Sequence, residues 1–454
     1  MGPRSVLAVL VTAQVVSVAN QNLIAVALPA LSRDLGASPV QELWIVDAYV
    51  LVVAALLVAG GVLGDRFGRR RALVAGLALF AAGSLVSALA ADPGVLIAGR
   101  VLQGLGPPLI LPASLALVTA AYEHPRERAR AIGIWGGVSG LGVAIGPLLG
   151  GVIVSGLGWR WAFAINVPVA AALVAGALAT IPRDAPAGER ARFDVLGGLL
   201  ATGAMGALVF GLIEGPERGW SSPEVLGALA AAVALAAAFV RVERRAAAPL
   251  VDLELVRHRA FMVANFAAFA LMFVLLPVSV YVSAFLQTFR DLSALQAGLA
   301  LLPVGLGVVI AAPISGRLTA RVAPRTLIVV GVLAAAAGTA LLGTAGAGAT
   351  AGDLVPALAL VGLGAGIALP PSTATAVGAV PLDRTGMASA LHNAGRQVGA
   401  TLGVAVLGSI VVAHAADGGA GAYRDGLATA MLVAAPVLVV VAALVVTTRR
   451  PAAP

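Results

Sequence analysis

Long apolar runs alternate along the chain with short polar segments rich in arginine, proline and glycine. Most of these runs hold about 20 residues, which as a helix is enough to cross roughly 30 Å of hydrocarbon. The pattern therefore predicts fourteen membrane-spanning helices. Their approximate ranges are 5–30, 41–63, 72–91, 95–120, 130–156, 161–180, 195–215, 223–241, 260–288, 296–320, 326–346, 353–379, 386–415 and 425–447.

Composition excludes a soluble globular protein. Hydrophobic residues make up 60% of the 454 residues, charged residues only 11%, and mean hydropathy is +1.00. Compact soluble domains cannot hide that much apolar surface. The chain has no cysteine, which removes disulfides, thiol nucleophiles and cysteine metal sites. The first run continues to about Pro29, longer than the core of a signal peptide, and is read as a retained helix.

The positions of the arginines predict the orientation in the membrane. All 29 basic residues are arginine; 22 fall in segments that are cytoplasmic if the N-terminus is inside, and five fall in the outer loops. Because cytoplasmic loops carry the excess of basic residues, we expect both termini in the cytoplasm. The net charge of +8 is then a topology signal, and no nucleic-acid partner is expected.

The chain also repeats itself. GLGPPLILPAS from Gly104 and GLGAGIALPPS from Gly362 share Gly-Leu-Gly, Leu-Pro and Ser at the same spacing, 258 residues apart. This offset predicts two six-helix bundles in the same orientation, over 1–180 and 260–454, with an inserted helix pair within 181–259. Parallel repeats of this kind place a transport site between the halves.

Four motifs of the first half follow one another in order. They are AVALP at Ala25–Pro29, GVLGDRFGRRR from Gly61, RVLQG from Arg100, and GVAIGPLLGG from Gly142, followed by WRWAFAINVP from Trp159. Together they resemble the major facilitator superfamily, and in particular its fourteen-helix drug:proton antiporters. The resemblance extends over essentially the whole chain, through FDVLGG at Phe193, LIEGPERGW at Leu212 and AGRQVG at Ala394.

The resemblance implies roles for two motifs. In the family, the turn after the second helix gates the inner side, and the matching positions are Gly61, Asp65, Arg66, Gly68 and Arg69. A plain basic topology anchor is the alternative. The antiporter Gly-Pro motif comprises Gly142, Gly146, Pro147 and Gly150. Its glycines lie four apart on one helix face and allow close helix packing, while the proline can bend the helix.

Ionisable residues well inside the predicted helices are few: Asp47, Arg100, His392 and Arg396. A buried charge in a membrane is costly, and intramembrane acids are usually functional. Asp47 and Arg100 lie at similar depth, so they are expected to interact directly or through water, unless each meets a different partner. We predict that Asp47 carries the coupling proton; His392, which titrates near neutral pH, is the alternative.

Polar and aromatic positions on several helices are candidates for the substrate cavity. They are Gln14, Ser17, Asn20, Gln21, Trp44, Tyr49, Gln103, Phe273, Tyr281, Phe285, Asn393, Arg396 and Gln397. Hydrogen bonding between helices is the other interpretation of the polar ones. The chain departs from the resemblance at Asn20, where related exporters carry an acid. One interior acid against two arginines favours neutral, zwitterionic or anionic substrates.

These patterns lead to one expected function. It is a multi-pass, monomeric plasma-membrane antiporter that exports hydrophobic small molecules, drugs or a natural product, against a proton influx. A lipid or glycolipid exporter and a non-transporting sensor or scaffold are the alternatives. An enzyme is not expected, because the four histidines are scattered and no nucleophile–base or metal-ligand spacing occurs. No cofactor is expected, since the proton gradient supplies the energy.

Overall fold

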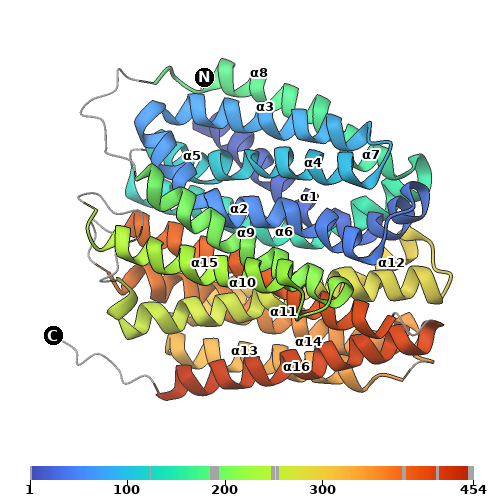
Figure 1. Ribbon diagram of the computed structural model, residues 1–454. Helices are drawn as coiled ribbons and strands as arrows, with labels where there is room; N and C mark the ends of the chain where they lie inside the picture. The colour runs from blue at the N-terminus through green and yellow to red at the C-terminus, as the bar shows by residue number, and fades with distance from the viewer. Residues whose placement is uncertain are drawn as a thin grey trace. The chain divides into compact units, whose positions relative to one another are not determined.

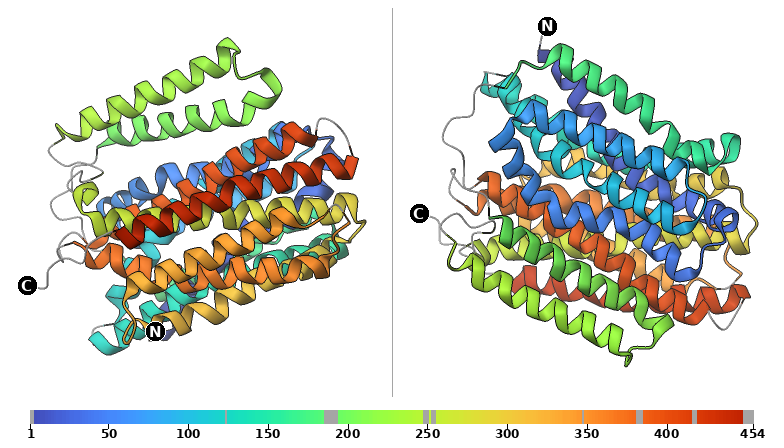
Figure 2. Two further views of the ribbon diagram at one scale, coloured as in Figure 1. Left: turned by 90° about the horizontal axis from the view of Figure 1, so that it is seen from below. Right: turned by 45° about the horizontal axis from the view of Figure 1, so that its top comes forward.

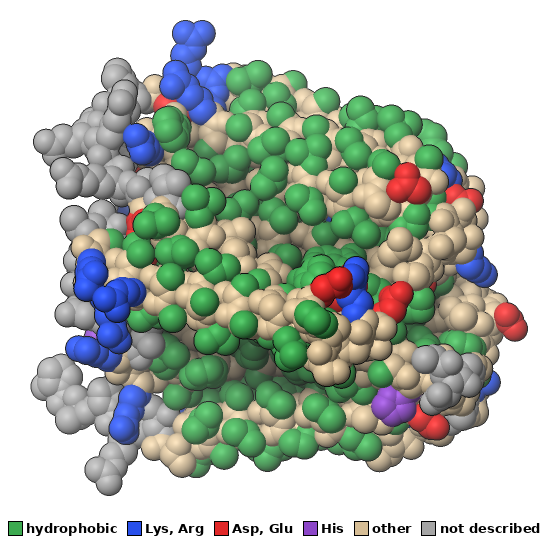
Figure 3. Space-filling view, viewed as in Figure 1, with side chains coloured by type: hydrophobic (Ala, Val, Ile, Leu, Met, Phe, Trp, Pro, Cys, Tyr) green, Lys and Arg blue, Asp and Glu red, His purple; other side chains and the backbone are tan. Residues whose placement is uncertain are grey.

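The computed structural model describes residues 3–122, 124–184, 194–246, 251, 255–346, 348–380, 385–415 and 419–447. Within these ranges the chain forms α-helices and one short 3-10 helix, η1 (Leu255–Arg257), and no β-strand. Hydrophobic side chains cover the lengths of the helices, and charged ones gather toward helix ends (Figure 3). The predicted all-α class is confirmed.

The chain forms two compact units, one of Met1–Leu250 with Leu286–Leu299, the other of Val251–Phe285 with Ala300–Pro454. The helices within Met1–Leu250 are α1 (Pro3–Leu35), α2 (Pro39–Phe67), α3 (Arg69–Ala88), α4 (Pro93–Gly104), α5 (Gly106–Ala121), α6 (Pro125–Leu157), α7 (Trp159–Ala164), α8 (Asn166–Thr180), α9 (Val195–Arg218) and α10 (Pro223–Glu243). The remaining helices are α11 (Arg259–Phe289), α12 (Ala294–Leu318), α13 (Pro324–Thr344), α14 (Ala351–Gly378), α15 (Thr385–Ala415) and α16 (Gly419–Thr447).

The membrane spans agree with the hydropathy pattern. Thirteen segments of the described chain are long and apolar enough to cross a membrane, and α6 adds the shorter apolar segment Leu141–Leu157. Two of the thirteen combine consecutive helices, α4 with α5 and α7 with α8. These segments correspond in order to the fourteen predicted ranges. The sidedness of the termini stays a prediction, as do the bounds of the three domains.

In the first unit, α1 packs along α6, and α3 packs on α4, α5 and α8 (Figures 1 and 2). The inserted pair α9–α10 joins this unit through α9, which packs on α2. In the second unit, α13 packs between α14 and α16, while α15 contacts both α14 and α16.

The internal repeat is visible in equivalent helix contacts. A Cβ atom added to Gly106 in α5 would lie 2.7 Å from the carbonyl oxygen of Gly76 in α3. A Cβ added to Gly364 in α14, 258 positions later, would lie 2.5 Å from the carbonyl oxygen of Gly331 in α13. In each unit the repeated glycine therefore lets two helix backbones approach closely, α5 with α3 in the first and α14 with α13 in the second, as small residues do at membrane helix interfaces.

Replacing a glycine at such a contact should destabilise the fold. In α14, a Cβ on Gly362 would lie 2.1 Å from the Val304 carbonyl oxygen, whereas one on Gly378 meets nothing within 4 Å. We expect Gly362→Ala to lower the free energy of unfolding by about 1–3 kcal/mol, the usual cost of overpacking. Thermal unfolding in detergent measures this against Gly378→Ala, which should match the parent. Equal melting temperatures for the two variants would contradict the packing assignment.

Candidate functional site

Asp47 lies in α2 with none of its surface exposed. Neither carboxylate oxygen has a hydrogen-bond partner in the described part of the chain. A buried ionised carboxylate without a partner is costly, so this side chain is poised either to be neutral or to meet a ligand.

Arg100 is held by other groups than Asp47. Its Nε donates to the Ile45 carbonyl oxygen at 3.0 Å, and its Nη1 donates to Gln103 Oε1 at 2.7 Å. The guanidinium carbon lies 4.5 Å from the centroid of the Tyr49 ring, a cation–π distance. Among the described residues, no ion pair joins Arg100 to Asp47. The direct pairing considered from the sequence is therefore absent, and Arg100 is braced by α2 backbone and α4.

Asn20 is the centre of a polar network between four helices. Its Oδ1 accepts hydrogen bonds from Gln103 Nε2 at 3.2 Å and from Asn166 Nδ2 at 2.9 Å. Gln103 Nε2 also donates to Ser84 Oγ at 2.7 Å. The network links α1, α3, α4 and α8, and through Gln103 it continues to Arg100. Such networks rigidify a buried site when their members are satisfied.

Other predicted cavity residues of the first unit take varied positions. Tyr49 is buried and its hydroxyl donates to the Ser17 carbonyl oxygen at 3.2 Å. Gln14 is buried as well, and Gln21 is half-buried. Trp44 contacts the inserted pair: its Nε1 donates to Glu214 Oε1 at 2.9 Å. Trp44 thus anchors α9 to α2, a contact the sequence did not indicate.

The second unit has a polar group of its own. His392 is buried, and its Nε2 lies 3.1 Å from Thr373 Oγ1. Arg396 Nη1 donates to Asn393 Oδ1 at 3.5 Å, and Gln397, next on α15, is half-buried.

The three predicted aromatic residues of α11 are all buried. The Tyr281 hydroxyl donates to the Val404 carbonyl oxygen at 2.9 Å. Phe273 stacks on Phe269, and Phe285 stacks on Tyr423. These contacts give each ring a packing role in the second unit.

The turn between α2 and α3 is tied to the end of α8. Asp65 pairs with Arg69 at 3.0 Å within the turn. Asp184, just beyond α8, accepts from the backbone N–H of Arg70 at 3.0 Å and of Arg71 at 3.1 Å. A carboxylate at these positions caps the first turn of α3 and complements its dipole.

Gly68 is required by this cap. Its φ is +105°, a conformation that L side chains rarely adopt. A Cβ there would also lie 2.3 Å from Asp184 Oδ2. The glycine of the motif therefore leaves room for the capping carboxylate. Gly61 is looser, since a Cβ there would be 3.5 Å from Pro112, an ordinary contact. Arg66 has its guanidinium carbon 5.3 Å from the centroid of the neighbouring Phe67 ring.

The glycines of the Gly-Pro motif face α1. A Cβ on Gly146 would lie 2.8 Å from the Ala19 carbonyl oxygen, and one on Gly142 would lie 2.8 Å from Val18 Cβ. Gly150 faces Leu23 in the same way, at 3.0 Å. The predicted close approach is thus present, and α6 continues as a helix through Pro147.

Comparison with known proteins decides the family. The Major Facilitator Superfamily model matches residues 10–404. The chain belongs to the major facilitator superfamily. The resemblance drawn from the motifs is confirmed, and this superfamily member is a multi-pass protein of the cell membrane.

Similar members of the superfamily are resistance proteins by name. The chain is 39% identical over 427 residues to the puromycin resistance protein pur8 of Streptomyces alboniger, covering 91% of this chain and 83% of that one. It is 37% identical over 401 residues to the tetracenomycin C resistance and export protein of Streptomyces glaucescens, covering 88% and 74%. The crystal structure of the peptide transporter POT in complex with sulfate superposes with a TM-score of 0.70 over 97% of this chain and 95% of that one; at 19% identity it shows the shared fold.

Four residues that contact the predicted site in this superfamily member were not predicted from the sequence. Three of them are hydrogen-bonded to predicted site residues: Asn166, Ser84 and Thr373. The fourth, Asp184, accepts from the backbone in the turn between α2 and α3. Asn166 and Ser84 lie in apolar helices, where a polar residue faces protein. That signal could have identified these two as members of the network.

Disrupting the Asn20 hub should remove the Oδ1 acceptor to which Gln103 Nε2 and Asn166 Nδ2 both donate. We expect Asn20→Leu to destabilise the protein by about 1–3 kcal/mol, the cost of burying unpaired polar groups. Thermal unfolding compares it with Gln21→Leu, a matched change at the next, half-buried position of α1. The effect should be non-additive with Asn166→Ala, because the two residues share a hydrogen bond. Strict additivity would refute the network.

Removing the cap on α3 should destabilise the turn between α2 and α3. We expect Asp184→Ala to cost about 0.5–2 kcal/mol, as for other helix caps, and Asp184→Asn to cost less because one acceptor oxygen remains. Melting temperature is the measurement, and Glu217→Ala, which removes an exposed carboxylate, is the control. The assignment fails if Asp184→Ala is as stable as that control.

Proposed function

We propose that this superfamily member is an efflux antiporter that exports hydrophobic small molecules by alternating access, driven by proton influx. The names of its relatives support export of antibiotics and other small molecules. The observation that carries the proposal is the Asp47 carboxylate, fully buried in a membrane-spanning helix with both oxygens unpartnered among the described residues.

Asp47 is the proposed proton carrier. Protonation makes it neutral and removes the cost of burying its charge, so a proton can be loaded on the outer side and released on the inner side. Arg100 is the proposed electrostatic neighbour of Asp47. Its guanidinium is held by hydrogen bonds to Ile45 and Gln103 and not by an ion pair with Asp47. Substrate moves in the opposite direction to the proton.

The proposed substrates are neutral, zwitterionic or anionic amphiphiles. Arg100 is fully buried in α4 and Arg396 is half-buried in α15, and Asp47 is the fully buried acid of α2. Fixed positive charge repels cations and attracts acceptor or anionic groups. Asn393 and Gln397, beside Arg396 on α15, add donors and acceptors for such groups.

Substituting Asp47 should separate coupling from transport. In proteoliposomes holding a panel of dyes and antibiotics, we expect Asp47→Asn to abolish substrate accumulation driven by a pH gradient. Downhill substrate exchange without a gradient should persist, because the amide mimics the protonated carboxyl. Glu42→Gln, which removes a carboxylate from the first turn of α2, is the control and should retain accumulation.

Two outcomes would contradict the coupling role. Asp47→Asn with unchanged pH-driven accumulation removes Asp47 from the mechanism. If His392→Gln alone loses accumulation while exchange survives, then His392 is the coupling group. Absence of transport for the whole panel in the parent protein would count against export of these substrates.

A further inference from the structure

The inserted pair α9–α10 distributes its charges unequally between its two ends. At the end where α9 meets α10, Arg218 pairs with both Glu214 and Glu224. Glu214 also accepts from Trp44. Arg218 thus has two carboxylate partners within the inserted pair.

The other end of α10 carries three arginines without such partners. Arg241, Arg244 and Arg245 are exposed and form no side-chain hydrogen bond or ion pair with any described residue. Arg241 lies three and four positions before Arg244 and Arg245, so three positive charges are gathered at the end of α10. This surface thus presents guanidinium donors that an anion from outside the chain can bind.

The nearest acid on the helix is directed elsewhere. Glu243 is buried, and its Oε1 lies 2.6 Å from where a Cβ on Gly197 would be, so it faces the start of α9. The carboxylate therefore lies on the protein side of α10, apart from the exposed guanidinium groups.

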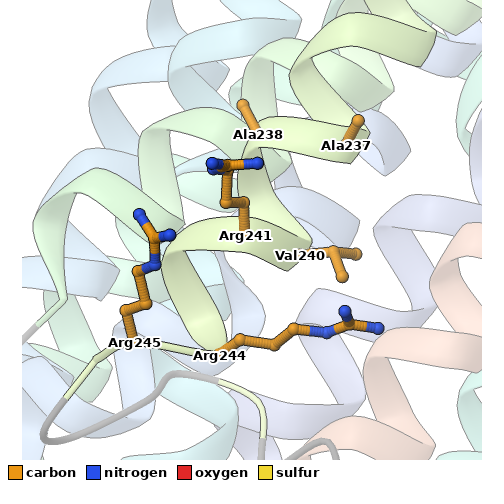
Figure 4. Close-up of a pocket in the computed structure, with 6 residues that line it drawn as sticks. All are labelled: Ala237, Ala238, Val240, Arg241, Arg244 and Arg245. Carbon is orange, nitrogen blue, oxygen red and sulfur yellow. The ribbon is translucent and has the colours of Figure 1, made fainter.

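The arginines line a surface cavity of about 450 Å³ together with Ala237, Ala238 and Val240. Figure 4 shows Arg241 and Arg245 directed to one side of the helix end and Arg244 to the other, below Val240. The cavity thus combines guanidinium donors with small apolar side chains one turn farther into the membrane.

The position of α10 indicates what fills this cavity. Among the described helices of its unit, α10 packs on α9, and its large side chains Leu226, Val233 and Val240 are exposed, as expected for a lipid-facing helix. Its 21 residues span about 31 Å at 1.5 Å per residue, close to the hydrocarbon thickness. The arginines then lie at the level of the lipid headgroups.

We propose that Arg241, Arg244 and Arg245 bind the headgroup phosphate of an anionic phospholipid whose acyl chains lie along Ala237, Ala238 and Val240. The guanidinium groups supply paired donors to phosphate oxygens. The apolar part of the cavity favours a lipid over a free anion. The bound lipid helps to fix the depth of the inserted pair, which among the described helices of its unit is joined to the rest through the contact of α9 with α2. This inference goes beyond the transport function and does not depend on it.

The test compares lipid binding by full-length variants. Purified protein is delipidated, phosphatidylglycerol or phosphatidylcholine is added, and bound lipid is counted by native mass spectrometry together with the shift in melting temperature. The parent should retain and be stabilised by phosphatidylglycerol. The triple change R241Q, R244Q, R245Q should weaken this binding by on the order of 100-fold, about fivefold per arginine.

Two further variants separate this site from general surface charge. The triple lysine variant R241K, R244K, R245K should keep most of the binding, because the charge remains. The triple variant R257Q, R317Q, R321Q removes the same charge from exposed arginines outside the inserted pair and should bind like the parent.

Three results would overturn the proposal. The first is undiminished phosphatidylglycerol binding by R241Q, R244Q, R245Q. The second is an equal loss in R257Q, R317Q, R321Q, which would reduce the effect to overall charge. The third is equal stabilisation by soluble glycerol phosphate, which would identify a free anion as the ligand.

Discussion

A buried polar group in a membrane helix must find its partner within the protein, and the Arg100 guanidinium shows how this chain meets that constraint. Two of its nitrogens donate to Ile45 and Gln103, and the Tyr49 ring covers it. Gln103 in turn is held by Asn20 and Ser84. Hydrogen bonds of Arg100 and of the side chains that hold it thus join α1, α2, α3 and α4. Close contacts such as that of Gly104 with the Tyr49 carbonyl oxygen bring these helices together as well, and the directional hydrogen bonds add to that packing.

Asp47 meets this constraint less well than Arg100 does. It lies two residues from Ile45, whose carbonyl oxygen holds Arg100, yet its own oxygens have no partner among the described residues. The two charged groups on adjoining helices thus differ: two nitrogens of Arg100 are hydrogen-bonded and its Nη2 is not, whereas both oxygens of Asp47 lack a partner among the described residues. The proposed division between a bracing cation and a proton-exchanging acid rests on this difference. Perturbed and unsatisfied groups concentrate at functional sites for this reason.

The apolar runs and the short polar segments between them were enough to predict the helices, because each span must satisfy its own backbone hydrogen bonds and present an apolar surface to lipid. They were not enough to predict which side chains contact one another. Asp184 caps α3 from 114 positions away, and Trp44 meets Glu214 across 170 positions. Neither pair shares a periodicity or a motif that a single sequence displays. Gly68 was recognised as part of the gating turn, but its reason, space for the Asp184 carboxylate, required the fold.

Asn20 shows why a departure from a family pattern has to be interpreted in three dimensions. From the sequence, an amide at this position looked like the loss of a titratable group. In the structure its oxygen accepts from two side-chain amides, Gln103 and Asn166. An amide oxygen performs this without bringing a second negative charge near Arg100. With a neutral amide at position 20, the network of Asn20, Gln103 and Asn166 joins α1, α4 and α8 without the cost of a further buried charge beside Arg100.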